Sequence, residues 1–316
     1  MTKEEKLFHN PIFVAAAALF CCLLWGSAFP AIKIGFQMFH VEGPGSQILF
    51  AGYRFFLAGL IAFAMACSKE KKIVTIKLSS VPYVFVQGLL QTTLQYLFFY
   101  LGLANTTGSK ASLINASNAF FTIIFSHFMI KGERMTWRKA IGCLVGFGGV
   151  IAVNLSAGGF DGALRFAGEG CVLLCAIAYG LSSVTLKKIS HLETPSAITA
   201  YQLLMGSSVL IITGFFAGGQ VYGFTPASTL LLFYLAAVSS VSFTLWATIL
   251  KYNPVGKVSI YGFSIPIFGV ALSAIFLHES AFTVQNLVAM ILVSIGIIIV
   301  NKTEQEDSSC HKKSCS

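Results

Sequence analysis

The sequence predicts an all-α membrane protein with ten transmembrane helices, arranged as two inverted five-helix repeats. Of its 316 residues, 56% are hydrophobic and only 10% are charged. The hydrophobic residues fall into ten long runs, and the second half of the chain repeats the pattern of the first. Soluble domains usually contain about 25% charged residues, so this chain has too little polar sequence to cover a surface exposed to water. The lipid bilayer is therefore the expected solvent for most of the chain.

Each hydrophobic run has about the length, ~20 residues, that an α-helix needs to cross a bilayer. The expected spans are 12–37, 46–67, 82–103, 111–130, 139–155, 169–187, 196–217, 229–251, 258–276 and 284–300. The runs are continuous rather than alternating, which favours helices over the strands of a membrane barrel. Pro82 and Pro195 open spans, whereas Pro30 and Pro266 fall inside spans and predict kinks.

The basic residues predict the orientation in the membrane. The net charge is +9, but the cations lie in short clusters between the apolar runs, as in loops that face the cytoplasmic leaflet rather than a nucleic acid. With the N-terminus placed in the cytoplasm, Lys33, Lys110 and Arg165 lie outside and Arg54 lies within a span, while all other Lys and Arg residues lie inside. We therefore expect a multi-pass protein of the cell membrane with both termini in the cytoplasm.

The two halves of the chain match in a constant order, at offsets of about 150 residues. Trp25-Gly26 matches Tyr179-Gly180, Tyr53-Arg54 matches Tyr201-Gln202, and GVIAVN at 149–154 matches GIIIVN at 296–301. The expected division is a cytoplasmic N-terminus (1–11), a first repeat (12–154), an outer linker (155–168), a second repeat (169–301) and a disordered cytoplasmic tail (302–316). Five spans is an odd number, so the second repeat enters the membrane from the opposite side. Inverted repeats are typical of transporters, whose solute site lies near the midplane between the halves.

Short motifs in both halves resemble the EamA type of the drug/metabolite transporter superfamily, over about residues 12–301. They are Trp25-Gly26-Ser27 with Phe29-Pro30, Arg54-Phe55, and Gly132-Glu133-Arg134-Met135-Thr136 followed by Gly142 and Gly149, with an echo from Glu279 to Gly296. The resemblance implies a ten-helix bundle with both termini in the cytoplasm that transports small organic solutes, often outward. The second half departs from the pattern at Tyr179, Gln202 and His278, so residue roles do not carry from one half to the other.

A polar stripe runs along the third span, where Tyr83, Gln87, Gln91 and Gln95 recur every four residues. Polar groups inside lipid are costly unless they are paired or face a cavity. The stripe is expected to line the solute path. The alternative is that these side chains hold the bundle together through hydrogen bonds between helices.

Arg54 is the most distinctive candidate, because it lies about eight residues into the second span. A charge at that depth needs a partner or water, and none of the expected spans contains Asp or Glu. Arg54 could pair with a solute carboxylate or phosphate, with backbone carbonyls, or with Glu42 or Glu169 at the outer edge. Because buried carboxylates commonly carry proton or sodium coupling, their absence favours a facilitator or an exchanger.

Further candidates for the solute path come from other spans. Trp25, near the middle of the first span, lines up with Phe29, and the two could form an aromatic wall for a planar or apolar solute group or simply pack in the core. The remaining candidates are Asn115 and Asn118 in the fourth span, Trp246 in the eighth and Tyr261 in the ninth. They are weaker, since polar groups in a helix often serve the bundle itself.

Small and acidic residues suggest structural roles elsewhere. Gly142 and Gly146 form a small-xxx-small pair, which indicates a close helix contact within the fold or between the subunits of a homodimer. Glu133 and Glu279 are expected to cap the starts of the fifth and tenth spans, where negative charge is favourable.

No P-loop, metal-ligand cluster in the membrane or catalytic dyad is present in the sequence, so neither an enzyme nor a cofactor is expected. Cys310, His311 and Cys315 could bind a metal or carry a lipid, but a polar, disordered tail is the preferred interpretation. The expected function is a secondary transporter that exports small metabolites, with amino acids or related carboxylates favoured, by alternating access. A carrier predicts a central cavity, whereas a membrane scaffold or receptor predicts a packed midplane whose polar groups pair with one another.

Overall fold

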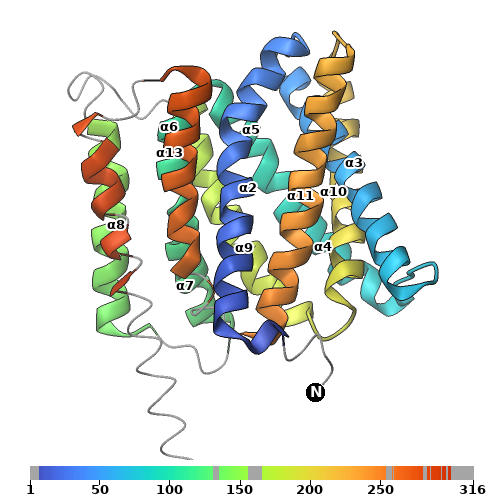
Figure 1. Cartoon of the computed structure of the whole chain (residues 1–316), viewed down its shortest axis with the longest axis horizontal. Helices are drawn as coiled ribbons and strands as arrows, with labels where there is room; N and C mark the ends of the chain where they lie inside the picture. The colour runs from blue at the N-terminus through green and yellow to red at the C-terminus, as the bar shows by residue number, and fades with distance from the viewer. Residues whose placement is uncertain are drawn as a thin grey trace, which may run out of the picture.

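The chain folds into a bundle of helices that stand side by side (Figure 1). The computed structural model describes residues 7–130, 135–155, 166–253, 258, 260–279, 283–284, 286–292, 294–296 and 298–299. Within these residues no strand occurs, as expected for an all-α membrane protein. Five helical stretches are long and apolar enough to cross a membrane, namely α2 (Pro11–Met38), α3 (Gly43–Glu70), η3 with α9 (Phe166–Ile189), α10 (Pro195–Phe216) and α11 (Pro226–Tyr252).

The other helical elements are shorter pieces of the expected spans. They are η1 (Leu78–Ser80), α4 (Val81–Gly88), the π-helix η2 (Leu89–Leu94), α5 (Gln95–Ala104), α6 (Gly108–Asn115), α7 (Asn118–Met129), α8 (Trp137–Leu155), the 3₁₀-helix η4 (Ile260–Phe263) and α13 (Ser264–Leu277). A further apolar helix covers the described residues between Asn286 and Gly296. The expected spans up to residue 276 start and end within about three residues of these elements.

Helix starts are marked by capping residues followed by proline. Asn10 accepts hydrogen bonds from the backbone N–H groups of Ile12 and Phe13, and Pro11 follows at the first helical position. Thr225 and Ser228 form a capping box at the start of α11. Such caps satisfy N–H groups that have no partner inside the helix, and proline costs nothing at that position. The local sequence therefore determines where these spans begin.

Glycine allows close helix contacts between α3 and α10 and between α10 and the α4–η2 run. A Cβ atom added to Gly206 would lie 2.4 Å from the carbonyl oxygen of Gly88, and one added to Gly52 would lie 2.9 Å from the backbone nitrogen of Ile211. Small residues let membrane helices approach closely enough for dispersion forces to hold them.

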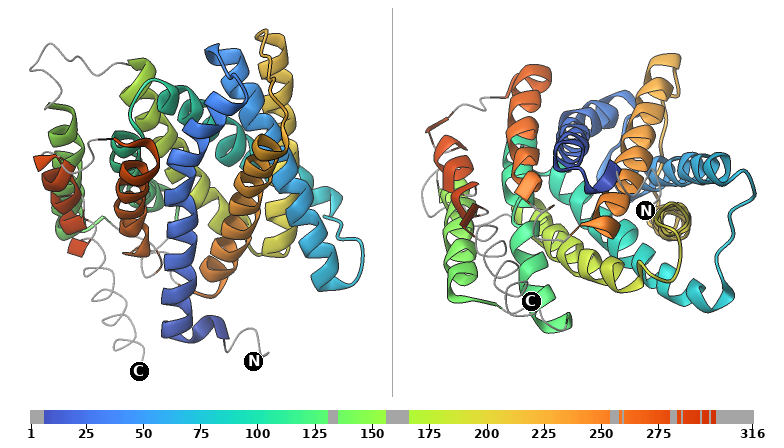
Figure 2. Two further views of the ribbon diagram at one scale, coloured as in Figure 1. Left: turned by 45° about the horizontal axis from the view of Figure 1, so that its top comes forward. Right: turned by 60° about the horizontal axis from the view of Figure 1, so that its bottom comes forward.

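The two halves contact each other reciprocally. Helix α2 packs on α11 and α13, and α9 packs on α5 and α7. The turned views in Figure 2 show α2 beside α13 and α11 from two directions. These contacts place α2 and α9 close to the centre of the bundle, where the candidate site is found.

Of two structural roles expected from the sequence, the close helix contact of Gly142 and Gly146 is confirmed, within the fold, and the other is not. A Cβ atom on Gly296 would lie 2.5 Å from the Gly142 carbonyl oxygen and 2.6 Å from the Gly146 nitrogen, so this glycine pair contacts the last helix within the chain. The expectation that Glu279 caps the tenth span is wrong. Its carboxylate accepts hydrogen bonds from the N–H groups of Gly108 (2.9 Å) and Ser109 (3.0 Å), because α13 ends beside the start of α6. Glu133, Arg165 and the Cys310–Cys315 tail lie outside the described residues.

Candidate functional site

Three of the helical runs are irregular near the middle of the bundle. The π-helix η2 directly precedes Gln95, the fourth run is interrupted at 116–117 between Asn115 and Asn118, and η4 precedes α13. Pro266 lies in the first turn of α13, directly after the 3₁₀-helix η4. The kink predicted at Pro266 is therefore replaced by a change from 3₁₀-helix to α-helix just before it. Irregular turns inside membrane helices are frequent at binding sites, where they expose polar groups to a cavity.

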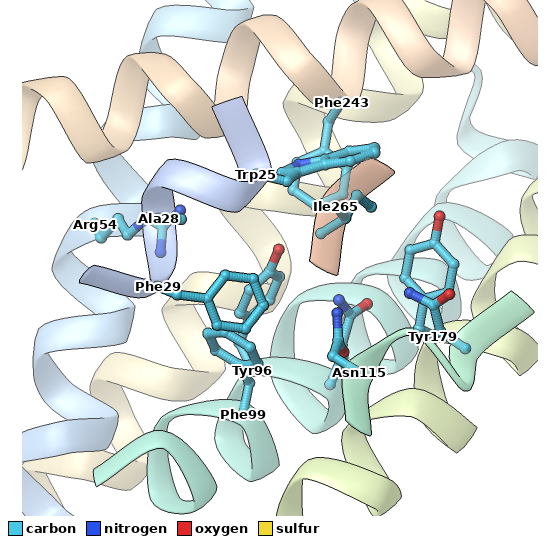
Figure 3. Close-up of a pocket in the computed structure, with 12 residues that line it drawn as sticks. Trp25, Ala28, Phe29, Arg54, Tyr96, Phe99, Asn115, Tyr179, Phe243 and Ile265 are labelled. Atoms are coloured by element: carbon cyan, nitrogen blue, oxygen red, sulfur yellow. The ribbon is translucent and has the colours of Figure 1, made fainter. Parts of the chain in front are cut away.

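A cavity with an empty volume of about 520 Å³, its open part included, lies beside these irregular turns (Figure 3). It is lined by residues of α2, α3, α5, α6, α7, α9, α11 and α13, namely Trp25, Ala28, Phe29, Arg54, Gln95, Tyr96, Phe99, Asn115, Asn118, Tyr179, Phe243 and Ile265. Both halves of the chain contribute to the wall, and half of the lining residues are aromatic.

Arg54 is the charged residue of this wall, and only 1% of its surface is exposed. Its Nε donates to the Leu235 carbonyl (3.2 Å), its Nη1 to the Tyr100 hydroxyl (3.0 Å) and its Nη2 to the Ser239 hydroxyl (2.9 Å). A guanidinium carries five N–H donors, so these bonds leave two donors for another partner. The group also lies over the Phe55 ring, with Cζ 4.7 Å from the centroid.

All three protein partners of Arg54 are electrically neutral. One of them is a backbone carbonyl, as the sequence allowed, but the two acids considered as partners lie elsewhere. Glu42 is exposed, and Glu169 accepts from Thr106 (2.9 Å) and lies 4.0 Å from the Lys110 ammonium. Over the described part of the chain, Arg54 takes part in no ion pair. A buried charge without a counter-charge is electrostatically costly, and a bound anion would lower that cost.

Two further polar atoms of the wall have no hydrogen-bond partner among the described residues. They are the donor Nε1 of Trp25 and the acceptor Oε1 of Gln95, and both atoms are buried. The Trp25 ring packs against Phe243 and Trp246, with centroid distances of 5.7 and 5.0 Å. Six other buried side-chain atoms of the described residues also lack a partner, but the Trp25 donor and the Gln95 acceptor lie beside one cavity, where a ligand could supply the missing bonds.

The interrupted fourth run brings two amide side chains to the same cavity. Asn115 ends α6 and Asn118 begins α7, and both line the wall. The Asn115 oxygen accepts a weak hydrogen bond from the Cys175 thiol (3.6 Å). In Figure 3, Asn115 and Tyr179 lie on one side of the view and Arg54 on the other, beyond the α2 segment that carries Ala28. The two sides therefore offer different chemistry to a solute, a cation on one and amides with a tyrosine on the other.

Two more cavities, each of which shares lining residues with the one before it, lie toward one end of the bundle. The first has about 410 Å³ of empty space, shares Asn118 and Tyr179 with the central cavity, and adds Trp246 and Leu250. The next, of about 310 Å³, shares Leu250 and is lined by Lys187 and Lys251, near the C-terminal ends of α9 and α11. These helix ends lie at the end of the bundle where α2 begins (Figure 1).

Of the nine residues expected to bind solute, six line these cavities. Trp25, Arg54, Gln95, Asn115 and Asn118 lie on the central cavity, and Asn118 and Trp246 on the next one. The three residues that line neither of these two cavities are Gln87, Gln91 and Tyr261.

The expectation of one continuous polar stripe is wrong. The Gln87 amide donates to the Gln91 oxygen at 2.8 Å, and Tyr83 is 56% exposed. The stripe divides because the wider turns of η2 change the rotation per residue, so only Gln95 reaches the cavity. Tyr261 lies in η4, where its carbonyl accepts from the Cys22 thiol (3.1 Å).

The aromatic wall considered for Trp25 and Phe29 is present, but the sequence reasoning missed four other aromatic residues of the cavity. They are Tyr96, Phe99, Tyr179 and Phe243. On a helix that is apolar all round, an aromatic residue facing a cavity cannot be told from one facing lipid. For Tyr179 a signal was present, because it is the counterpart of Trp25 in the second half.

Comparisons with known proteins agree with this architecture. The EamA-like transporter family matches the chain twice, over residues 12–155 and 166–302. The uncharacterized transporter YvbV of Bacillus subtilis (strain 168) is 30% identical over 285 residues, which cover 89% of each chain. A probable amino-acid metabolite efflux pump of Escherichia coli (strain K12) is 26% identical over 88% of this chain and 91% of its own.

A solved crystal structure shares the fold, with a TM-score of 0.70 at 17% identity over 90% of this chain and 94% of that one. At this identity the likeness concerns the fold alone. The family match covers nearly all of the chain in two copies, and the similarity to YvbV extends over nearly the full length of both proteins. The chain therefore belongs to the EamA-like transporter family.

Proposed function

We propose that this chain is a secondary transporter that exports small organic metabolites, amino acids or related carboxylates, across the cell membrane by alternating access. Its relatives are transporters rather than enzymes. The observation that carries the solute class is Arg54, a buried cation on the wall of the central cavity whose protein partners are neutral. A carboxylate matches the planar fork of a guanidinium and forms strong, charge-assisted hydrogen bonds with it. The name of the Escherichia coli relative points to the same class and to export.

The proposed architecture has ten spans in two inverted repeats, 12–154 and 169–301, joined by an outer linker at 155–168. The reciprocal packing supports it, because α2 of the first repeat contacts α11 and α13, and α9 of the second contacts α5 and α7. Both termini, 1–11 and 302–316, are placed in the cytoplasm by the distribution of basic residues. Each repeat then contributes one wall of the site, as in other transporters built from inverted repeats.

In this mechanism the structure corresponds to a state that is accessible from the cytoplasm. A solute anion would be attracted by Lys187 and Lys251 at the cytoplasmic end and would reach Arg54 by way of the adjoining cavities, whose shared lining residues would have to move apart. At the outer end, Glu279 links α13 of the second repeat to α6 of the first. Release to the outside requires these contacts to break while the repeats rock about the solute. The described lining of the cavities holds no carboxylate, so an exchanger or a facilitator is favoured over coupling through a buried acid.

A non-transporting scaffold or receptor is the competing proposal. It requires the polar groups of the midplane to pair with one another, as Gln87 and Gln91 do. The unpaired Trp25 Nε1 and Gln95 Oε1 beside a cavity favour the carrier instead, because a protein built only for packing gains nothing by leaving buried polar atoms unsatisfied.

The test is uptake into proteoliposomes that contain the purified protein, with a pooled set of labelled amino acids and carboxylates. Arg54→Gln removes the cavity cation, and Arg138→Gln makes the same substitution at an exposed residue. Transport by the wild type and Arg138→Gln that is lost in a folded Arg54→Gln variant supports the proposal. Equal transport by all three removes Arg54 from the site, and no transport of any pooled solute favours the scaffold.

A further inference from the structure

The charge balance of the cavity wall is one-sided. Of the twelve residues that line the central cavity, Arg54 is the charged one, and the lining of the adjoining cavity adds only neutral residues. The other polar groups of the central wall are the amides of Gln95, Asn115 and Asn118, the hydroxyls of Tyr96 and Tyr179 and the indole N–H of Trp25. A solute inside this space therefore meets one positive charge and several neutral hydrogen-bonding groups.

Aromatic rings supply much of the remaining wall. Phe29 contacts Phe99 edge-on with centroids 5.3 Å apart, and Trp25 contacts both Phe243 and Trp246. Figure 3 shows the rings of Phe29 and Tyr96 between Arg54 and Asn115, with the Trp25 ring above them beside Phe243. Stacked and edge-to-face contacts favour a planar ring over a flexible aliphatic chain, and the rings themselves are held rigid by one another.

We propose that the solute of this cavity is an aromatic carboxylate that carries no ammonium group, and therefore a net charge of −1. The inference rests on the proposed function and narrows it. The carboxylate binds the two remaining N–H donors of Arg54, and the ring lies among Trp25, Phe29 and Phe243. A ring N–H or hydroxyl on the solute would reach Gln95 Oε1, the buried acceptor that has no partner.

The argument against a zwitterion is electrostatic. An ammonium group loses its hydration on entering the cavity, and the described wall offers it no carboxylate in return. Neutral acceptors and ring faces recover part of that loss, but the ammonium also meets the like charge of Arg54 in a medium of low dielectric constant. An amine without a carboxylate is disfavoured further, because it brings no negative charge to compensate for the positive charge of Arg54.

The experiment compares four small probes that differ by one group. They are 3-phenylpropionate, phenylalanine, phenethylamine and hexanoate, and their binding to the purified protein is measured by titration calorimetry, with uptake into proteoliposomes in parallel. We expect 3-phenylpropionate to bind at least about tenfold more tightly than phenylalanine and hexanoate, and phenethylamine not to bind. Arg54→Gln should abolish this preference.

A designed change of selectivity provides an independent test. Gln95→Glu places a carboxylate on the cavity wall, and Gln220→Glu makes the same substitution at an exposed loop residue. The ratio of 3-phenylpropionate to phenylalanine affinity should fall at least about fivefold in Gln95→Glu and stay unchanged in Gln220→Glu.

The outcomes separate this inference from the proposed function. Phenylalanine binding as tightly as 3-phenylpropionate overturns the exclusion of the ammonium group, and hexanoate binding equally well overturns the aromatic requirement. In both cases the carrier proposal stands, because a solute is still transported. Uptake of aliphatic amino acids without binding of any aromatic probe overturns the inference alone, whereas failure of both the probes and the pooled solutes overturns the proposed function with it.

Discussion

Replacing Arg54 by Met separates a role in solute binding from a role in stability. The guanidinium makes three hydrogen bonds, to Tyr100, Ser239 and the Leu235 carbonyl. Hydrogen bonds to a charged group contribute about 1.5–3 kcal/mol each, whereas burying an ion without a counter-charge costs several kcal/mol. Because these terms are similar in size and opposite in sign, we expect Arg54→Met to change the free energy of unfolding by less than about 2 kcal/mol.

The groups that remain after this substitution are mostly satisfied. The Ser239 hydroxyl still donates to the Leu235 carbonyl at 3.1 Å, so the Tyr100 hydroxyl is the group left buried without its partner. That loss costs about 1–3 kcal/mol. The double variant Arg54→Met/Tyr100→Phe removes the hydroxyl as well and should be at least as stable as Arg54→Met alone.

The assay is equilibrium unfolding in lipid nanodiscs, with and without 3-phenylpropionate. A ligand present at 100 times its dissociation constant stabilises the folded protein by about 2.7 kcal/mol. The solute should therefore stabilise the wild type and leave Arg54→Met unchanged. A loss of more than about 4 kcal/mol in Arg54→Met without solute would refute the reasoning, because Arg54 would then be a structural residue. Equal stabilisation of both proteins by the solute would refute it as well.

Three further substitutions test other parts of the structure. Gly206→Ala forces a Cβ to within 2.4 Å of a backbone oxygen of α4 and should lower the unfolding free energy in nanodiscs by about 1–3 kcal/mol. In the control variant Gly148→Ala the added Cβ meets no atom within 4 Å, so the unfolding free energy should not change. Equal effects of the two substitutions would contradict the packing argument. Glu279→Gln weakens the cap on α6 and should speed amide hydrogen exchange at 108–112 by about tenfold, and unchanged exchange would remove Glu279 from that role. Trp25→Phe keeps an aromatic ring but removes the unpaired Nε1 donor. The affinity for 3-phenylpropionate should therefore fall about fivefold, with the free energy of unfolding unchanged. An unaltered affinity would show that Nε1 does not contact the solute.

The spans could be predicted from the sequence because the bilayer imposes a simple physical requirement. About 20 apolar residues and a satisfied backbone are needed to cross it, and starts such as Asn10-Pro11 and Thr225-Pro226 are encoded locally. Arg54 was identifiable for the same reason, since a charge within an apolar run is rare. Its protein partners were not predictable, because Ser239 and Leu235 come from a helix about 180 residues further along the chain.

The side chains of the wall were predicted only in part, because regular helical geometry was assumed. The spacing of Gln87, Gln91 and Gln95 describes one face of an α-helix, and the π turns of η2 break that face. The interruption at 116–117 carries neither Gly nor Pro, the strongest breakers of a helix, and the Asn and Ser residues around it are weaker signals of a turn. The apolar pattern specifies a helix but not the type of its turns.

The central claim is that the Arg54 cavity binds the solute of a carrier, and solute counterflow tests it most directly. Proteoliposomes are loaded with unlabelled carboxylate and diluted into a trace of the labelled compound. The wild type and Arg138→Gln are expected to accumulate label transiently above equilibrium, and Arg54→Gln is expected to show no overshoot. An overshoot of equal size in Arg54→Gln, or its absence from the wild type for every amino acid and carboxylate tried, would contradict the claim.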